Sequence, residues 1–256
     1  MNWTPFSEAE ISQSILEAYH EKLVAATECD VLIAGAGPSG LTAAWRLANA
    51  GQRVTVVEKR LATGGGIWGG AMGLNQIAVQ PEAVNVLEEL GVRHRPGRGQ
   101  LRVVDAIELA AALARAAVQA GANVLNLLAV EDVVVHEGRV RGLVVNRTEL
   151  LKVLPVDPLT LLARAVVDAT GHDAVVASCL KRRGLLDSDL GEGPMDAQAG
   201  ERFVVERACE VFPGLWVAGM SVCTVFSGPR MGPIFGGMLL SGQRVAELVL
   251  KRLQGQ

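Results

Sequence analysis

Residues 30–58 constrain the fold of this chain more than any other segment. An apolar run at residues 31–33 leads into Gly35-Ala36-Gly37-Pro38-Ser39-Gly40, and a second apolar run ends at Glu58. Strand, glycine turn, helix, second strand and terminal acid follow one another in the order that is typical of a dinucleotide-binding βαβ unit. An ordinary glycine-rich turn is the alternative, and it does not explain an acid at the end of the second strand.

Each residue of this pattern has a physical role. Gly35 permits the tight turn, Gly37 lets the backbone approach a pyrophosphate, and Gly40 lets the helix pack closely on the strand. The free N–H groups and the positive dipole end of that helix would face the phosphates. Glu58 is placed to accept hydrogen bonds from the adenosine ribose hydroxyls, and a carboxylate there repels a 2′-phosphate. The pattern therefore favours NAD or FAD over NADP.

Composition narrows the class of protein. Half of the 256 residues are hydrophobic and the net charge is −3, so no broad basic surface for nucleic acid is expected. No apolar run is long enough to span a bilayer, and the first residues do not resemble a signal peptide, so a cytoplasmic location is expected. Four cysteines lack CxxC spacing, which predicts buried free thiols and no zinc site: Cys29, Cys179, Cys209 and Cys223.

The first 28 or so residues predict a leading helix. Ser7 and Glu10 form a potential capping box, and apolar residues follow on one helical stripe at Ile11, Ile15, Tyr19 and Leu23. This stripe needs a surface to cover. It is expected to brace the first strand or to pack on another subunit.

The remaining pattern predicts an α/β, flavoprotein-like fold in a single domain, 1–256, with a Rossmann-type βαβ unit and a mainly parallel central sheet. A smaller β-rich insertion is expected at about 122–160. Residues 64–70, which are rich in glycine, are expected to be irregular backbone that approaches a ligand, and 184–200 a mobile polar loop. The other expected elements are helices at 82–90, 105–120 and 235–253 and strands at 123–127, 130–136, 140–145, 161–168 and 215–219.

The nucleotide-binding half resembles flavoproteins with two dinucleotide-binding domains, so an FAD-dependent oxidoreductase is one hypothesis. In those proteins an aspartate follows the late strand, here residues 213–219, and binds the flavin ribityl or phosphate groups. This chain has Met220 at that position. A thioether is a weak acceptor and cannot replace a carboxylate.

The whole chain, including the leading helix, also resembles the thiamine thiazole synthases of archaea and bacteria. The resemblance rests on the glycine turn at 35–41 and on the sequences at 64–72, 156–159 and 168–173. It rests most specifically on Pro229-Arg230-Met231-Gly232-Pro233-Ile234-Phe235-Gly236-Gly237-Met238. It implies that NAD and glycine are substrates, that NAD is consumed, and that the product is an ADP-linked carboxythiazole. It also implies a homo-oligomer, an octamer in the family.

The resemblance assigns roles to individual residues. Asp157 and His172 match the ferrous iron ligands of the family, and a carboxylate with an imidazole is a plausible Fe(II) donor set. Arg230 matches the clamp on the glycine carboxylate, for which a planar guanidinium is suited. The alternatives are a solvent-facing loop histidine and a structural ion pair. Nucleotide contacts are implied at Ser39, Glu58, Lys59, Gly66, Val130, Pro155, Val156 and Met220.

Pro155 departs from the family pattern. Members that sacrifice their own sulfur have a cysteine two residues before the aspartate, and members that use free sulfide have a histidine. Proline has neither a thiol nor an imidazole, so the expected sulfur source is external: free sulfide or another carrier. The same residue leaves open a catalytically idle protein that binds NAD or ADP-ribose.

Overall fold

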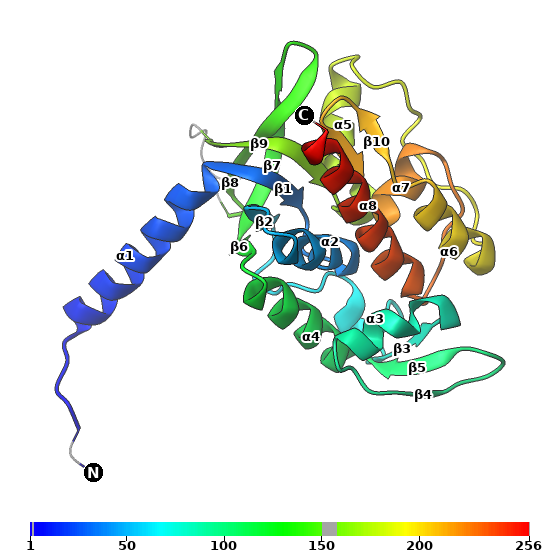
Figure 1. Cartoon of the computed structure of the whole chain (residues 1–256), viewed down its shortest axis with the longest axis horizontal. Coiled ribbons are helices and arrows are strands. Elements are labelled where there is room, and N and C mark those ends of the chain that lie inside the picture. The colour runs from blue at the N-terminus through cyan, green and yellow to red at the C-terminus, as the bar shows by residue number, and fades with distance from the viewer. Residues whose placement is uncertain (2, 150–157, 256) are drawn as a thin grey trace.

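A computed structural model describes residues 1, 3–149 and 158–255 of the chain. Figure 1 shows a layered α/β body from which the leading helix, α1 (Glu8–Ala26), projects. The strands are β1 (Glu28–Ala34), β2 (Val54–Glu58), β3 (Gln76–Val79), β4 (His94–Pro96), β5 (Arg102–Asp105), β6 (Asn123–Asn126), β7 (Leu128–His136), β8 (Arg139–Arg147), β9 (Leu159–Asp168), β10 (Glu210–Phe212) and β11 (Leu215–Val217). The further α-helices are α2 (Pro38–Asn49), α3 (Val84–Glu89), α4 (Ala106–Gln119), α5 (Val175–Arg182), α6 (Ala197–Glu206), α7 (Met220–Val225) and α8 (Gly236–Gln254), with 3₁₀ turns η1 (Ile67–Gly69), η2 (Pro81–Ala83) and η4 (Gly171–Asp173).

Within the described ranges the central sheet has eight strands, six of which lie side by side in the order β10-β11-β9-β1-β2-β6. The four pairings from β11 to β6 are parallel, while β10 pairs with β11 in the antiparallel sense. The hairpin of β7 and β8 joins this sheet through antiparallel pairing of β8 with β9. The predicted α/β fold with a mainly parallel sheet is therefore confirmed. Strands of the predicted β insertion belong to this same sheet.

The central strands are buried on both faces, as parallel sheets require. Val31 and Ile33 of β1 face a core built with α2, α4 and α8, whereas Leu32 and Ala34 face a second core with β7, β8 and α5. The two sets alternate because successive side chains of a strand point to opposite faces. α2 packs between α4 and α8 on one face of the sheet (Figure 1), and its N-terminus lies where β1 and β2 end.

A second, antiparallel sheet of three strands, β3-β5-β4, lies beside α3 and α4 (Figure 1). The sequence analysis did not predict it, because strands of three or four residues carry too few alternating positions to be distinguished from loops. The glycine-rich segment 64–70 also differs from expectation. It contains the 3₁₀ turn η1 and is not irregular throughout.

The leading helix has the predicted capping box. The Glu10 N–H donates to Ser7 Oγ at 3.3 Å, and the Ser7 N–H donates to Glu10 Oε2 at 2.7 Å. Among the described residues, the helix contacts the body near its C-terminus, where Lys22 Nζ donates to the Val124 carbonyl at 2.6 Å. The rest of the predicted stripe is mostly solvent-exposed, with Ile15 63% and Tyr19 40% accessible. Within the described ranges, no helix is both long and apolar enough to cross a membrane.

Candidate functional site

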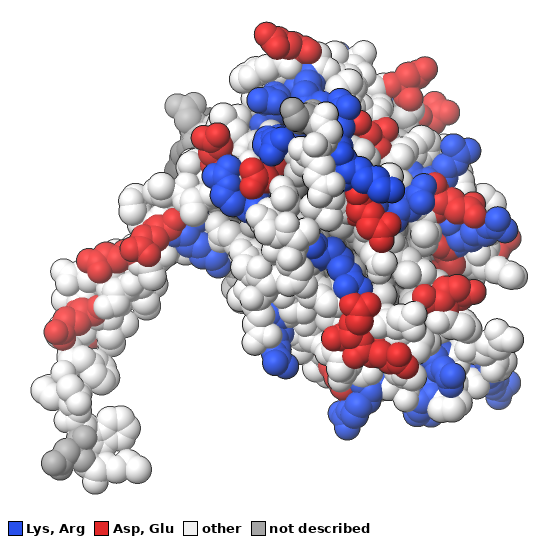
Figure 2. Space-filling view, viewed as in Figure 1, with Lys and Arg blue, Asp and Glu red and all other residues white. Residues whose placement is uncertain are grey.

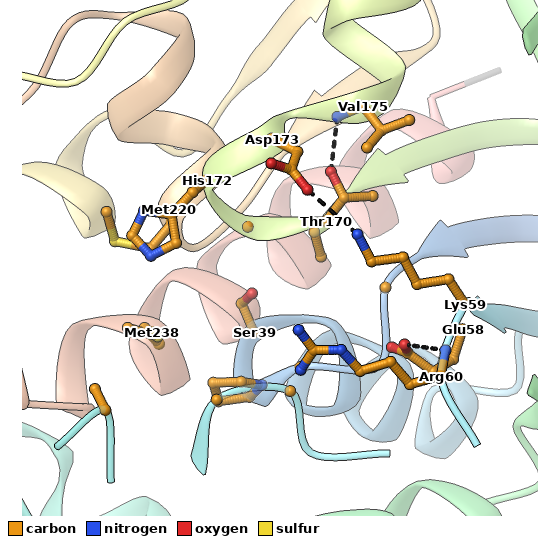
Figure 3. A pocket seen from close by; sticks show the side chains of 18 of the residues that line it. Ser39, Glu58, Lys59, Arg60, Thr170, His172, Asp173, Val175, Met220 and Met238 are labelled. Carbon is orange, nitrogen blue, oxygen red and sulfur yellow. Dashed lines mark hydrogen bonds and ion pairs between the residues drawn. The ribbon is translucent and has the colours of Figure 1, made fainter. Parts of the chain in front are cut away.

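A cavity of about 880 Å³ opens where β1, β2 and β9 end and α2 begins. Ligands collect at this edge in open α/β sheets because loops and helix N-termini converge there. Figure 3 shows Glu58 at one end of the cavity and His172 with Met220 at the other, while Ser39 lies between them. The predicted site residues that line it are Gly35, Gly37, Ser39, Glu58, Lys59, Gly66, Val130, His172, Met220 and Arg230.

The three glycines of the turn are required for different structural reasons. Gly35 has a φ of +96°, and a Cβ there would stand 2.4 Å from the Ala169 carbonyl oxygen. A Cβ on Gly40 would stand 2.0 Å from the Gly35 carbonyl oxygen, so this glycine serves helix–strand packing and does not line the cavity. A Cβ on Gly37 would meet no atom within 4 Å. Gly37 therefore borders open space, as expected beside a ligand.

The N-terminus of α2 has no side-chain cap. Gly37 is the N-cap residue, Pro38 occupies the first turn, and no side chain of the described residues accepts a hydrogen bond from the first N–H groups. A helix start without protein acceptors attracts anions through its N–H groups and its dipole. The glycine turn thus presents a surface suited to a diphosphate.

Glu58 is held rigidly at the end of β2. Its side chain is buried, with Oε2 accepting from the Ala36 N–H at 2.8 Å and Oε1 accepting from the Arg60 N–H at 2.8 Å. Each carboxylate oxygen has further acceptor capacity, which can serve a ribose diol. The two main-chain hydrogen bonds therefore fix the carboxylate and leave it able to accept further hydrogen bonds.

Three cations line the cavity, and two of them are paired with carboxylates. Lys59 Nζ lies 3.2 Å from Asp173 Oδ2, and Arg230 Nε lies 3.4 Å from Glu192 Oε2. Arg60, the third, makes no ion pair with any residue in the described ranges. Its side chain runs from the Glu58 end toward the middle of the cavity (Figure 3). The sequence analysis missed Arg60 because nothing in its spacing distinguishes it from a surface arginine.

A buried acid positions the turn that carries His172. Asp168, at the end of β9, accepts hydrogen bonds through Oδ2 from the Val176 and Ala177 N–H groups, both at 3.0 Å, at the start of α5. Its Oδ1 accepts from the Thr170 hydroxyl at 2.7 Å and lies 3.1 Å from the Ser221 hydroxyl. Because a fully buried carboxylate with this many donors cannot move freely, the η4 turn is fixed relative to the sheet.

A carboxylate that the sequence analysis did not identify, Glu192, contacts two of the predicted site residues. Glu192 Oε1 lies 2.6 Å from His172 Nδ1, and its Oε2 lies 3.4 Å from Arg230 Nε. The residue belongs to the loop predicted to be mobile at 184–200, where polar composition gave no signal of a site. The structure brings His172 and Arg230 together through this residue.

Of the two predicted iron ligands, Asp157 and His172, the structure describes His172. Asp157, Pro155 and Val156 lie outside the described residues, as does any contact they make. Within the described ranges no group of three His, Cys, Asp or Glu side chains could hold a metal ion. His172 lines the cavity, and because Glu192 engages Nδ1, its Nε2 remains for a ligand role. One imidazole fits as part of a ferrous site that Asp157 would complete.

Comparison with known proteins identifies the family. A model of the Thi4 family matches residues 12–235. The chain belongs to the Thi4 family. Its sequence is 50% identical over 247 residues to the thiamine thiazole synthase of Thermococcus kodakarensis, covering 96% of this chain and 98% of that protein. The predicted resemblance is thereby confirmed.

Solved structures agree with this assignment to the Thi4 family. The crystal structure of Thermovibrio ammonificans THI4 superimposes with a TM-score of 0.94 at 46% identity, covering 98% of this chain and all of that one. The L-proline dehydrogenase from P. horikoshii has a TM-score of 0.54 at 13% identity, over 88% of this chain and 94% of that one. The second likeness concerns the fold alone.

Proposed function

We propose that this member of the Thi4 family is a thiamine thiazole synthase that converts NAD, glycine and free sulfide to an ADP-linked carboxythiazole with Fe(II). One observation carries the proposal. A single cavity contains a dinucleotide cradle at one end and the linked His172 and Arg230 at the other. An enzyme that builds a heterocycle on a nucleotide needs both ends in one space, because the nucleotide must stay bound while its ribose reacts.

The nucleotide end supports NAD as the substrate that is bound and consumed. The uncapped start of α2 suits the diphosphate, and Glu58 suits the adenosine ribose. Lys59 and Arg60 place positive charge beside the same anion. The nicotinamide ribose would then extend toward His172 and Met220, which Figure 3 shows at the opposite end.

The other end supports glycine. The Arg230 side chain is 52% exposed and lines the cavity, and its ion pair with Glu192 uses Nε. The two terminal nitrogens of the guanidinium therefore remain for a carboxylate, which they can bind in a bidentate manner. A bound ferrous ion would act as a Lewis acid for the imine and enol chemistry of ring formation. His172, with Asp157, would hold it.

The cysteines support an external sulfur source. Burial raises the pKa of Cys29 to about 11 and the pKa of Cys223 to about 12, and it also raises the pKa values of Cys179 and Cys209. A thiol must ionise to react, so these groups are poor nucleophiles and poor sulfur donors. None of them is among the described residues that line the cavity. These observations favour an external sulfur source, for which free sulfide is our proposal.

A homo-oligomer is part of the same proposal. Trp3 and Phe6 before α1 and Ile15 and Leu16 on it are each more than 60% exposed. In Figure 2 this projecting helix carries its acidic residues among uncharged neighbours. An exposed apolar stripe of this kind is unfavourable in water and is covered when copies of the chain associate. Sedimentation of the purified protein should give an oligomer, and a monomer would contradict this part.

Two measurements test the activity. Mass spectrometry of the small molecule released by denaturing the purified protein should detect NAD or a thiazole adenylate, whereas FAD would favour the oxidoreductase hypothesis. Anaerobic incubation with NAD, glycine, Fe(II) and sulfide should then yield the ADP-carboxythiazole, and His172→Ala should yield none. Retained nucleotide without product under these conditions would instead indicate an idle NAD or ADP-ribose binding protein.

A further inference from the structure

Glu192 contacts one nitrogen of His172 and one nitrogen of Arg230. The other nitrogens of these two side chains do not contact it. It contacts the inner nitrogens, His172 Nδ1 at 2.6 Å and Arg230 Nε at 3.4 Å. The Glu192 side chain is only 16% exposed, whereas those of His172 and Arg230 are 61% and 52% exposed. The carboxylate therefore sits behind the two groups, and their outer nitrogens remain accessible.

Main-chain pairing fixes Glu192 in this place. The Gly193 N–H donates to the Gly228 carbonyl at 2.8 Å, the Arg230 N–H donates to the Pro194 carbonyl at 3.2 Å, and the Asp196 N–H donates to the Arg230 carbonyl at 3.0 Å. The segments that carry Glu192 and Arg230 are thus joined backbone to backbone. Their side chains meet because of this pairing and not through a chance approach of two long surface residues.

A hydroxyl attaches the same arrangement to α7. Thr224 is buried, and its Oγ1 lies 2.9 Å from the His172 carbonyl oxygen and 3.4 Å from Glu192 Oε1. Its single proton can be donated to one acceptor at a time, and the shorter contact is to the His172 carbonyl. Thr224 therefore holds the main chain of His172, and the carboxylate that meets the His172 ring lies beside this hydroxyl.

We propose that Glu192 is a positioning residue that presents His172 Nε2 and the terminal guanidinium nitrogens of Arg230 to the cavity together. The proposal rests on the function proposed above. A carboxylate that accepts from Nδ1–H fixes the neutral imidazole in the tautomer whose Nε2 lone pair is free for a metal. The same carboxylate compensates the charge of Arg230 while both Nη groups remain for the carboxylate of glycine.

The first test observes the ring directly and needs no metal or substrate. Long-range proton–nitrogen NMR of the metal-free protein, under mildly alkaline conditions where free histidine is neutral, reports which ring nitrogen carries the proton. The His172 signals, assigned through their loss in His172→Gln, should show the Nδ1–H tautomer in the native protein. Glu192→Ala should shift them toward Nε2–H. Glu206→Ala, which removes a glutamate from an ion pair on α6, should change nothing.

The second test separates the two contacts. Glu192→Ala should weaken binding of Co(II), titrated alone under anaerobic conditions, by roughly 10- to 100-fold. Glu192→Gln keeps an acceptor for Nδ1–H but no charge for Arg230. It should therefore retain most of the Co(II) affinity and raise the KM for glycine more than it lowers kcat. Binding of ADP-ribose should be unchanged in both variants, because the nucleotide end makes no contact with Glu192.

The results distinguish this inference from the proposed function. If the native protein binds neither Co(II) nor glycine, the proposed function fails. If the native protein binds both, while Glu192→Ala and Glu192→Gln leave the tautomer, Co(II) affinity and glycine KM unchanged, the positioning role is wrong. Circular dichroism and ADP-ribose binding establish that each variant is folded. If Glu192→Ala does not fold, Glu192→Gln, which preserves the shape of the side chain, still tests the role.

Discussion

Glu58 Oε2 accepts a hydrogen bond from the Ala36 N–H at 2.8 Å, so the acid that ends β2 is bonded to the glycine turn that follows β1. One side chain thereby fixes the spacing between the two parts of the proposed dinucleotide site. The bond also orients the carboxylate before any ligand arrives, which lowers the entropic cost of binding.

Glu58→Ala should therefore weaken binding of NAD and of ADP-ribose by about 1.5 to 3 kcal/mol, the scale of hydrogen bonds to a charged group. Isothermal calorimetry measures the change directly. Glu88→Ala, at an exposed position of α3, should bind like the native protein. Unchanged affinity in a folded Glu58→Ala variant would show that the carboxylate does not contact the ribose.

Substitution by alanine should lower stability at Gly40 and nucleotide affinity at Gly37. An added Cβ at residue 40 would stand 2.0 Å from the Gly35 carbonyl, so Gly40→Ala should lower the free energy of unfolding by about 1 to 3 kcal/mol or more. At residue 37 the Cβ meets nothing within 4 Å, so Gly37→Ala should fold normally and lose nucleotide affinity. Denaturant unfolding and calorimetry on both variants measure this. Equal stability of the two would contradict the packing role of Gly40.

Arg60 should contribute charge to the nucleotide site. Arg60→Met keeps most of the side-chain length and should weaken ADP-ribose binding by about 1 kcal/mol, roughly fivefold, because an exposed cation is screened by solvent. Adenosine, which has no phosphate, should bind almost unchanged, and the dependence of ADP-ribose affinity on salt should decrease. Arg98→Met, at an exposed loop position, is the matched control. An equal loss for adenosine would assign Arg60 to the base or ribose.

The sequence predicted the fold where local patterns and tertiary packing agree. The glycine turn and the capping box at Ser7 depend on neighbours within a few residues, and the two buried strands around the turn carry apolar runs that can be recognised locally. Glu192 could not be found in this way. Its role arises because residues 193–196 pair with residues 228–230, a contact between segments more than thirty positions apart. Arg60 differs from a surface arginine because the chain, as it leaves β2, places its side chain in the cavity.

Glu201 should make stability depend on pH. Burial raises the pKa of this α6 carboxyl from 4.5 to about 7, and nearby Glu82 raises it further, whereas the Gly237 N–H and the Gln80 side chain oppose the shift. At a pH between these two pKa values, 4.5 and about 7, the native state retains a proton on Glu201 that the unfolded state has released. The free energy of unfolding should therefore fall as pH rises through this interval, by on the order of 3 kcal/mol in total, and then level off.

Glu201→Gln tests this by removing the titration. In the described structure Oε1 of Glu201 and Oε1 of Gln80 are both buried without a hydrogen-bond partner, and an amide at residue 201 supplies a donor. The variant should be more stable than the native protein above neutral pH and should lose the slope, as measured by urea unfolding across the pH range. Glu206→Gln, on the exposed side of the same helix, should retain the native slope. A native profile in Glu201→Gln would exclude the buried carboxyl as its cause.

Sulfur should come from solution and not from the protein. The resemblance to thiazole synthases aligns Pro155, which lies outside the described part of the chain, with the sulfur-donating cysteine that it implies for some members. Full or partial burial raises the pKa values of all four cysteines. Intact-protein mass spectrometry after incubation with NAD, glycine and Fe(II) should show no loss of about 34 Da, the mass that leaves when a cysteine surrenders hydrogen sulfide. Added sulfide should allow multiple turnovers, and Pro155→His should preserve or raise the rate because it restores the imidazole of sulfide-using relatives. A dehydroalanine at any of the four cysteines after one turnover would overturn this conclusion.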